Sequence, residues 1–172
     1  EVEPATSLDL IRSVLPVGGS VIDIGSGASH LVDHLLEQTT GSITLLDVSE
    51  VALQKVKERL GAKAERVHWI VGDVTQIEQL PTCDVWHDRA VFHFLTSADD
   101  RRRYIELAVR TIAANGYLIV GVFAPDGPAK CSGLEVCRYD AAGLASEFGK
   151  SFCLLRTESV RHTTPAGKSQ SF

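Results

Sequence analysis

Three aspartates follow or close short apolar runs near the start of the chain, and their order suggests a shared ligand. Asp23 lies in the first run directly ahead of a glycine loop, Asp47 closes the second, and Asp73 comes just after the third. Short apolar runs separated by amphipathic stretches predict parallel strands, whose carboxyl ends meet at one edge of a sheet. Carboxylates at that edge can bind several polar groups of one ligand.

The loop after Asp23 has the composition of a ligand-binding turn. Its residues assigned to binding are Ile24, Gly25, Ser26, Gly27 and Ser29. Gly25 and Gly27 let the backbone turn sharply and let a ligand approach closely. His30 stands where the dinucleotide-binding pattern has a third glycine. The Asp23 carboxylate would repel a pyrophosphate but attract a cationic ligand, so the loop favours a cationic nucleoside cofactor.

The second and third aspartates complete the outline of a nucleoside. Asp47 can accept hydrogen bonds from both hydroxyls of a ribose, and Val48 beside it is assigned to the same site. After Gly72, Asp73 can accept from an exocyclic adenine amine while Val74 packs on the ring. Each residue alone could simply cap a helix or form a turn. The occurrence of all three acids in order at successive strand ends favours binding.

Through these residues, the sequence resembles the class I methyltransferase superfamily. The resemblance runs through Asp23-Ile24-Gly25-Ser26-Gly27, Asp47, Gly72-Asp73-Val74 and a C-terminal hairpin pattern. It implies S-adenosylmethionine as the cofactor, whose ammonium and sulfonium suit Asp23. Through Ser29 and Asp47-Val48-Ser49, the sequence also resembles the branch that includes lysine methyltransferases of elongation factors and citrate synthase. The methyl acceptor is thus expected to be a protein lysine or a small molecule.

The fourth apolar run leads into residues that this topology would place at the reactive end of the cofactor. Asp88 is predicted to position an acceptor amine or accept its proton, and Arg89 to hold a carboxylate. Both are also assigned to cofactor contact. His93 is predicted to act as a base near neutral pH. His87 and His93 can equally pack in the core, so the choice among these groups stays open.

The wider pattern predicts an α/β fold. Strands are expected at 20–24, 42–47, 67–71, 83–87 and 117–123, and helices at 51–60, 98–113 and 140–148. Near the C-terminus, two strand-like segments flank a turn signal and predict an antiparallel β-hairpin; they are 152–162 and 169–172, with the turn at 164–167. The expected architecture is one domain over residues 1–172, with a doubly wound, mostly parallel seven-stranded sheet that the hairpin completes.

Composition excludes several other classes. The 172 residues include 44% hydrophobic and 23% charged residues, with a formal net charge of -5, which argues against nucleic acid or an anionic membrane as partner. No metal site is expected, because His30, Asp33 and His34 lack another well-placed ligand. No signal peptide or membrane-spanning run is visible, which predicts a cytoplasmic protein. The absence of methionine suggests that an initiator region is missing.

Two further classes of function compete with methyl transfer. A nicotinamide-dependent oxidoreductase on a similar sheet would use Gly25, Gly27 and Asp47, but it would leave Asp23 and Asp73 unexplained. A noncatalytic module could keep the methyltransferase fold as a binding platform. The intact acids argue against the second alternative, and a cofactor titration separates all three.

Overall fold

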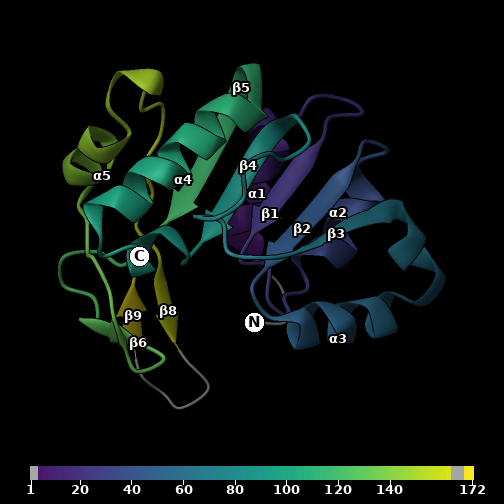
Figure 1. Ribbon diagram of the computed structural model, residues 1–172, viewed down its shortest axis with the longest axis horizontal. Helices are drawn as coiled ribbons and strands as arrows, with labels where there is room; N and C mark the ends of the chain where they lie inside the picture. Colours follow the sequence, from purple (N-terminus) through teal and green to yellow (C-terminus); the bar gives the residue numbers. More distant parts are fainter. Residues whose placement is uncertain (1–3, 164–168) are drawn as a thin grey trace.

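Five parallel strands form the main sheet of the computed structural model, which describes residues 4–163 and 169–172. The strands lie in the order β3-β2-β1-β4-β5, and their arrowheads point to one edge of the sheet (Figure 1). They are β1 (Val21–Ile24), β2 (Ile43–Asp47), β3 (Val67–Val71), β4 (Cys83–Arg89) and β5 (Ile112–Gly121). The expected parallel sheet is thus confirmed. The strand order reverses between β1 and β4, where such sheets bind ligands.

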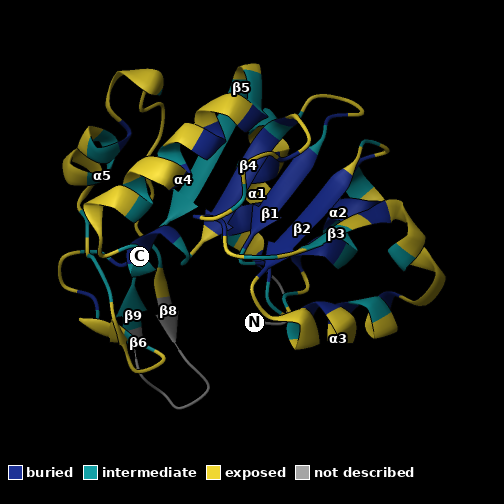
Figure 2. Cartoon of the chain, in the orientation of Figure 1, coloured by how far each residue is buried: buried dark blue, intermediate teal, exposed yellow. Residues whose placement is uncertain are grey.

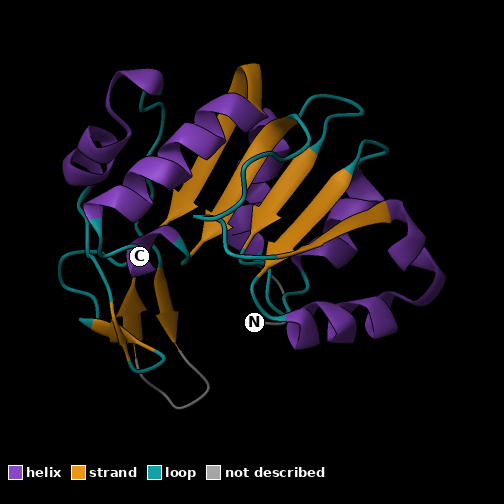
Figure 3. Ribbon diagram, viewed as in Figure 1, coloured by secondary structure: helices purple, strands orange, loops and turns teal. Residues whose placement is uncertain are grey.

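Helices cover both faces of this sheet (Figure 3). The helices are α1 (Ala5–Val14), α2 (Leu31–Gln38), α3 (Glu50–Leu60), α4 (Ala98–Thr111) and α5 (Ala141–Phe148), with short 3₁₀ turns η1 (Gly61–Arg66), η2 (Phe92–Phe94) and η3 (Gly149–Ser151). Side chains from α1, α2 and α3 share one buried cluster, and side chains from α4 and α5 share the other. Between them, β1, β2 and most of β4 are buried, whereas the edge strands β3 and β5 are mostly of intermediate exposure (Figure 2).

Alternation along the strands decides which face each side chain occupies. Val21 and Val85 belong to the cluster beneath α1, whereas Ile22 and Trp86 belong to the cluster beneath α4. Successive side chains of a strand point to opposite faces. The odd-numbered residues of β1, and those of β4 from Val85 onward, therefore face α1, and the even-numbered residues of the same stretches face α4. Side chains on the same face of these two strands can meet in one site, whereas side chains on opposite faces cannot.

The predicted boundaries of α3 are close to those observed because local capping decides both ends. The Ser49 hydroxyl accepts a hydrogen bond from the backbone N–H of Ala52. The helix ends at Gly61, whose φ of 55° is left-handed and suits glycine. Similarly, α5 begins after Asp140, whose carboxylate accepts from the backbone N–H of Gly143. The first helix, α1, was not among the expected elements.

The boundary between α4 and β5 differs from the prediction. The helix ends at Thr111 and the strand begins at Ile112, ahead of the residues expected to open it. Asn115, a residue type that favours turns, lies within β5 with a φ of 64°. The pairing of β4 with β5 shifts register between Cys83 and Val85. A bulge inside a strand uses the same turn-forming residues as a connection between elements.

The prediction of a seven-stranded sheet is wrong, since the main sheet contains five strands within the described residues. The remaining strands form two separate antiparallel pairs: β6 (Lys130–Cys131) with β7 (Leu134–Glu135), and β8 (Arg161–Thr163) with β9 (Ser169–Ser171). The predicted turn at 164–167 lies outside the described residues. At the C-terminus, Phe172 packs on Phe123 with ring centroids 4.8 Å apart, so side-chain packing links this end to the residues after β5.

Candidate cofactor site

The glycine loop after β1 has two left-handed residues with different surroundings. Gly25 has a φ of 63° and Gly27 a φ of 54°, a region that favours glycine. A Cβ added at Gly25 would collide with Val91, so packing requires glycine there. A Cβ added at Gly27 would meet nothing within 4 Å. The space beside Gly27 is therefore open to a ligand.

Asp47 joins the end of β2 to this loop. One of its carboxylate oxygens, Oδ2, accepts a hydrogen bond of 2.7 Å from the backbone N–H of Gly27. The other, Oδ1, accepts one of 2.7 Å from the N–H of Ser49. The backbone carbonyl of Asp47 accepts from the N–H of Gly72 at 3.0 Å. Each carboxylate oxygen has a second lone pair, so Asp47 can still accept from ribose hydroxyls.

Arg59 at the end of α3 holds the far side of the loop. Its guanidinium donates to the backbone carbonyls of Ala28 at 3.1 Å and Ser29 at 2.6 Å. It also pairs with the Asp33 carboxylate at 2.8 Å. The Ser29 hydroxyl accepts from the N–H of Leu31 at 3.1 Å, where α2 begins. The C-terminal end of the loop is thus fixed by hydrogen bonds to α3 and to the start of α2.

Asp23 lies at one end of a chain of buried polar side chains. The register of β1 and β4 places it opposite His87. One Asp23 oxygen, Oδ1, lies 2.7 Å from Nδ1 of His87, and Nε2 of His87 lies 2.9 Å from the hydroxyl of Ser7 on α1. Asp23, His87 and Ser7 are all buried. An ionised carboxylate only accepts hydrogen bonds, so Nδ1 of the imidazole carries the proton.

A small cavity of about 80 Å³ opens beside this chain. It is lined by Pro4, Ser7, Asp23, Gly25, Ser26, Ser29, Leu31, His87 and Arg89. The buried hydroxyl of Ser26 has no hydrogen-bond partner within the part of the chain that the structure describes. An unsatisfied buried polar group costs about 1–3 kcal/mol, which a ligand could recover. The cavity brings together a carboxylate, a guanidinium and an unpaired hydroxyl.

The residues after β3 border the open side of the loop. Asp73 is exposed, and its carboxylate accepts from the N–H and the hydroxyl of Thr75, each at 2.8 Å. Val74 is buried, so its side chain does not offer the predicted packing surface for an adenine ring. Val48 and Val71, at the ends of β2 and β3, are 70% and 52% exposed. These two side chains present exposed apolar surface at this edge of the sheet.

The structure divides the predicted binding residues into three groups. Those around the small cavity are Asp23, Gly25, Ser26, Ser29 and Arg89. Those on the open side of the loop are Gly27, Asp47, Val48, Gly72 and Asp73. Those whose side chains are buried elsewhere are Ile24, Val74, Asp88 and His93. The first two groups together outline the predicted site.

Asp88 faces α4 rather than the small cavity, and its carboxylate is enclosed. The residue is 0% exposed, and it accepts hydrogen bonds from the N–H groups of Val91 at 2.8 Å and Phe92 at 3.0 Å. The hydroxyl of Tyr104 donates a third at 2.6 Å. Burial raises the pKa of Asp88 to about 6, although these hydrogen bonds act in the opposite direction. The geometry does not support the predicted contact with a methyl acceptor.

Tyr104 connects Asp88 to the core, and its removal is expected to destabilise the protein. The indole N–H of Trp86 donates to the Tyr104 hydroxyl at 2.8 Å, and this hydroxyl donates to Asp88. Tyr104→Phe leaves both buried partners short of a hydrogen bond and should lower the free energy of unfolding by about 2 kcal/mol. Urea unfolding at pH 7 measures this, with Tyr117→Phe as a control that loses no described hydrogen bond. Equal stability of the two variants would contradict the assigned network.

His93 is also fully enclosed. It is 0% exposed, and neither ring nitrogen has a hydrogen-bond partner among residues 4–163 and 169–172. Its ring packs against Phe94 and Phe123, with centroids 4.5 Å and 4.6 Å away. Burial lowers the pKa of His93 to about 4, so the imidazole is neutral at pH 7. It has the lone pair of a base, but its side chain does not line the small cavity.

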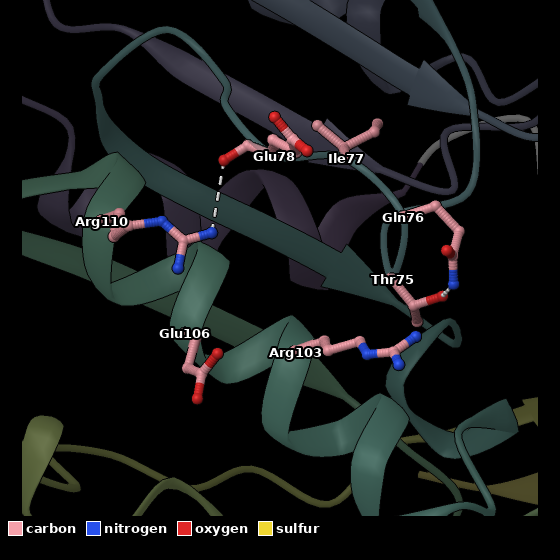
Figure 4. Close-up of a pocket in the computed structure, with 7 residues that line it drawn as sticks. All are labelled: Thr75, Gln76, Ile77, Glu78, Arg103, Glu106 and Arg110. Atoms are coloured by element: carbon pink, nitrogen blue, oxygen red, sulfur yellow. Dashed lines mark hydrogen bonds between the residues drawn. The ribbon is translucent and has the colours of Figure 1, made fainter.

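A second, larger cavity of about 260 Å³ lies between residues 75–78 and α4 (Figure 4). Arg110 donates to the backbone carbonyl of Glu78 at 3.3 Å, and Glu106 and Arg103 line the same space. Both acidic and basic side chains surround this cavity, so its charge does not favour one class of ligand. The described portion of the chain contains no cluster of potential metal ligands. None of its helices is long and apolar enough to cross a membrane.

A glycine loop and acidic side chains at the carboxyl edge of a parallel sheet define a nucleoside-binding α/β protein. Residues 21–116, more than half of the chain, match the family described as a methyltransferase domain. The chain therefore belongs to this family. No curated protein matches the sequence. The narrower resemblance to the lysine methyltransferase branch is not confirmed.

Solved structures share the fold at low identity. A methyltransferase dependent on S-adenosylmethionine from Methanosarcina mazei has a TM-score of 0.75 and 13% identity, covering 94% of this chain and 92% of that chain. One from Clostridium acetobutylicum has a TM-score of 0.60 and 13% identity, covering 68% of this chain and 48% of that chain.

A third structure contains a bound product of the cofactor. Phosphoethanolamine N-methyltransferase 1 of Haemonchus contortus, in complex with phosphoethanolamine and S-adenosylhomocysteine, has a TM-score of 0.62 and 20% identity, covering 81% of this chain and 30% of that chain. This chain spans about half the length of the Clostridium relative and less of the Haemonchus one. S-adenosylmethionine is the cofactor that the family and these structures indicate.

Sequence reasoning missed the roles of Ser7, His87 and Arg59. The position of His87 could have been predicted, because the parallel register of β1 and β4 and the alternation along each strand place it on the same face as Asp23. Ser7 was missed because α1 was not predicted, although Leu8 and Ile11 have the spacing of one apolar helix face. Nothing local to Arg59 indicates that it reaches a loop far away in the sequence.

Proposed function

We propose that this chain transfers a methyl group from S-adenosylmethionine to an acceptor. The observation that carries the proposal is the glycine loop with its two acids: Asp23 lines the small cavity beside the loop, and Asp47 accepts from the N–H of Gly27, where the space is open. A pyrophosphate would meet negative charge on both sides of this loop, whereas a sulfonium nucleoside with an ammonium group meets complementary charge. This argument, together with family membership, supports methyl transfer over nicotinamide chemistry.

The residues present suit the parts of this cofactor. Asp23 would pair with the ammonium group, and Arg89, which lines the same cavity, would attract the carboxylate. The unpaired hydroxyl of Ser26 would hydrogen bond to the same amino-acid portion. Asp47 would accept from the ribose hydroxyls, and the exposed Val48 would pack on the adenine.

The chain's own contribution to catalysis is chiefly alignment. The bound cofactor supplies an already activated methyl group, so the protein must hold an acceptor atom in line with it and exclude water. An amine acceptor must also lose one proton. Asp88 and His93 remain predicted groups for this step, and both are enclosed in this structure. Of the two, neutral His93 has one basic nitrogen lone pair without a partner among the described residues, and it would need its aromatic cover to move aside.

We favour a small-molecule acceptor over a protein lysine. Support comes from the Haemonchus relative, which is named for the methylation of phosphoethanolamine, a small amine. Incubation with radiolabelled S-adenosylmethionine, in parallel with a small-amine panel and a lysine-containing protein extract, separates the two classes. Label recovered only in the protein fraction would reverse this preference.

Calorimetric titration with S-adenosylhomocysteine and with NAD tests the cofactor. Saturable binding of S-adenosylhomocysteine, without binding of NAD, is the expected result. Binding of NAD alone would indicate an oxidoreductase. Binding of S-adenosylhomocysteine without transfer to any acceptor would indicate a noncatalytic platform.

A matched pair of glycine variants tests where the cofactor lies. Gly27→Ala and Gly61→Ala each place a side chain at a positive φ, 54° and 55°, where an added Cβ meets nothing within 4 Å. Gly61 ends α3, away from the small cavity. We expect Gly27→Ala to weaken S-adenosylhomocysteine binding roughly tenfold or more, because the methyl group occupies ligand space, while Gly61→Ala changes it less than about twofold. If Gly27→Ala and Gly61→Ala bind S-adenosylhomocysteine equally well, the ligand does not occupy the space beside Gly27.

A further inference from the structure

The buried chain from Ser7 through His87 to Asp23 links the first helix to the glycine-loop strand. The hydroxyl of Ser7 lies 2.9 Å from Nε2 of His87, and Nδ1 of His87 lies 2.7 Å from Oδ1 of Asp23. The exposed fractions of these residues are 6%, 3% and 3%. Among the ionisable side chains, Asp23 and His87 form a close pair that is almost completely removed from water.

The hydrogen-bond chemistry of the chain gives each member one role. Because the Asp23 carboxylate accepts, Nδ1 of His87 donates, and the tautomer with its proton on Nδ1 accepts from the Ser7 hydroxyl at Nε2. This fixes both the tautomer and the orientation of the ring. Oδ1 of Asp23 bonds to His87, its other oxygen has no hydrogen-bond partner among the described residues, and Asp23 lines the cavity.

The position of α1 makes this arrangement depend on helix docking. Leu8 and Ile11 anchor the helix in the core and are both 0% exposed. Ser7 therefore reaches His87 from a fixed backbone. Pro4, immediately ahead of the helix, lines the same cavity as Asp23. The start of α1 thus forms one wall of the place where a charged ligand group would bind.

We infer that Ser7 and His87 are positioning residues that orient the Asp23 carboxylate toward the ammonium group of the cofactor. This inference rests on the proposed function. Ser7 and His87 do not touch the ammonium in this scheme; they keep one Asp23 oxygen occupied and the other directed into the cavity. The first helix is then part of the binding site for the amino-acid end of the cofactor, and it has no part in binding the nucleoside end.

Two ligands that differ at the amino-acid end test this directly. S-adenosylhomocysteine carries the ammonium and carboxylate groups, whereas 5′-methylthioadenosine keeps the nucleoside and lacks both groups. Ser7→Ala should weaken S-adenosylhomocysteine binding roughly fivefold and leave 5′-methylthioadenosine binding within about twofold. Ser13→Ala is the matched control, because Ser13 lies on the same helix with its hydroxyl bonded to the carbonyl of Leu10 at 2.7 Å, exposed to solvent.

Substitutions at His87 provide the second arm. His87→Gln keeps a donor and an acceptor and should retain S-adenosylhomocysteine binding within about threefold, whereas His87→Leu should lose roughly thirtyfold. Thermal unfolding followed by circular dichroism confirms that each variant is folded. If His87→Leu does not fold, Ser7→Ala and His87→Gln still decide the question.

The possible results separate this inference from the proposed function. Selective loss of S-adenosylhomocysteine binding in Ser7→Ala, with retention in His87→Gln, supports positioning. If Ser7→Ala weakens the binding of both ligands equally, Ser7 has a merely structural role and the inference is overturned. Unchanged binding of both ligands in Ser7→Ala also overturns it. A wild-type protein that binds neither ligand overturns the proposed function itself.

Discussion

Replacement of Asp23 by asparagine should weaken binding of S-adenosylhomocysteine by roughly 100-fold while the fold remains intact. The amide has nearly the same shape and can still accept a hydrogen bond from Nδ1 of His87. It lacks the negative charge that would face an ammonium in a cavity sheltered from water. Loss of one partner of a buried charge pair costs about 3 kcal/mol, which corresponds to this change in affinity. Calorimetric titration of both proteins measures it.

Two comparisons make the Asp23 result specific. Binding of 5′-methylthioadenosine should not change, because this ligand has no ammonium group. Asp9→Asn, at an exposed carboxylate on α1, should bind both ligands like the wild type. If Asp23→Asn binds S-adenosylhomocysteine normally, the ammonium lies elsewhere. If both ligands bind less tightly, the substitution has disturbed the glycine loop.

Replacement of His93 by phenylalanine should make the protein more stable, and the gain should grow as the pH falls. The pKa of His93 is lowered by burial from 6.5 to about 4, so between these pH values the unfolded chain binds a proton that the folded protein does not. Wild-type stability therefore decreases by about 3 kcal/mol from this group as the pH falls through that range. The variant avoids this loss. At pH 7 it should gain about 1 kcal/mol by removing two unsatisfied nitrogens.

Asp88 has the opposite pH dependence and partly masks that of His93 in the wild type. Its pKa is raised by burial from 3.8 to about 6, so the folded protein binds a proton more readily than the unfolded chain between these values. Its contribution to stability therefore increases as the pH falls through this range. The difference between wild type and His93→Phe isolates the histidine.

Urea unfolding at pH 7 and pH 4.5 measures the effect of His93→Phe. Substitution of His68, an exposed histidine on β3, by phenylalanine is the control and should leave the pH dependence unchanged. The same pH dependence in His93→Phe and wild type would show that His93 is hydrated or hydrogen bonded. A variant less stable than wild type at both pH values would show that the larger ring does not fit among the surrounding phenylalanines.

The parts of the fold that were predictable depend on local sequence. The five strands are apolar runs because the sheet is buried on both faces, and α3 has a serine cap and a terminal glycine. The limits of β5 were not predictable, because Asn115 has the same preference in a bulge as in a turn. That the C-terminal strands stay outside the main sheet was also not predictable from local pattern, since alternation shows that a strand can form but not which sheet it joins.

The candidate site also has parts that the sequence predicts and parts that it does not. The glycine loop, Asp23 and Asp47 follow one another at successive strand ends, so topology alone brings them together. Asp88 was assigned to the acceptor because it ends a strand, but alternation turns it toward α4. His87, one residue earlier, faces Asp23. The contribution of Ser7 depends on the docking of α1, which only tertiary packing determines.

The hydrogen bond between Asp47 and the backbone N–H of Gly27 has a consequence for how a ligand enters. The loop already has its curved conformation, because Asp47 and Arg59 hold it before any nucleoside arrives. Ligand binding therefore does not need to order this segment, and the entropy lost on association comes mainly from the ligand itself. In a site of this kind, the strength of the individual contacts governs how long the ligand stays, and closure of the loop does not limit how fast it enters.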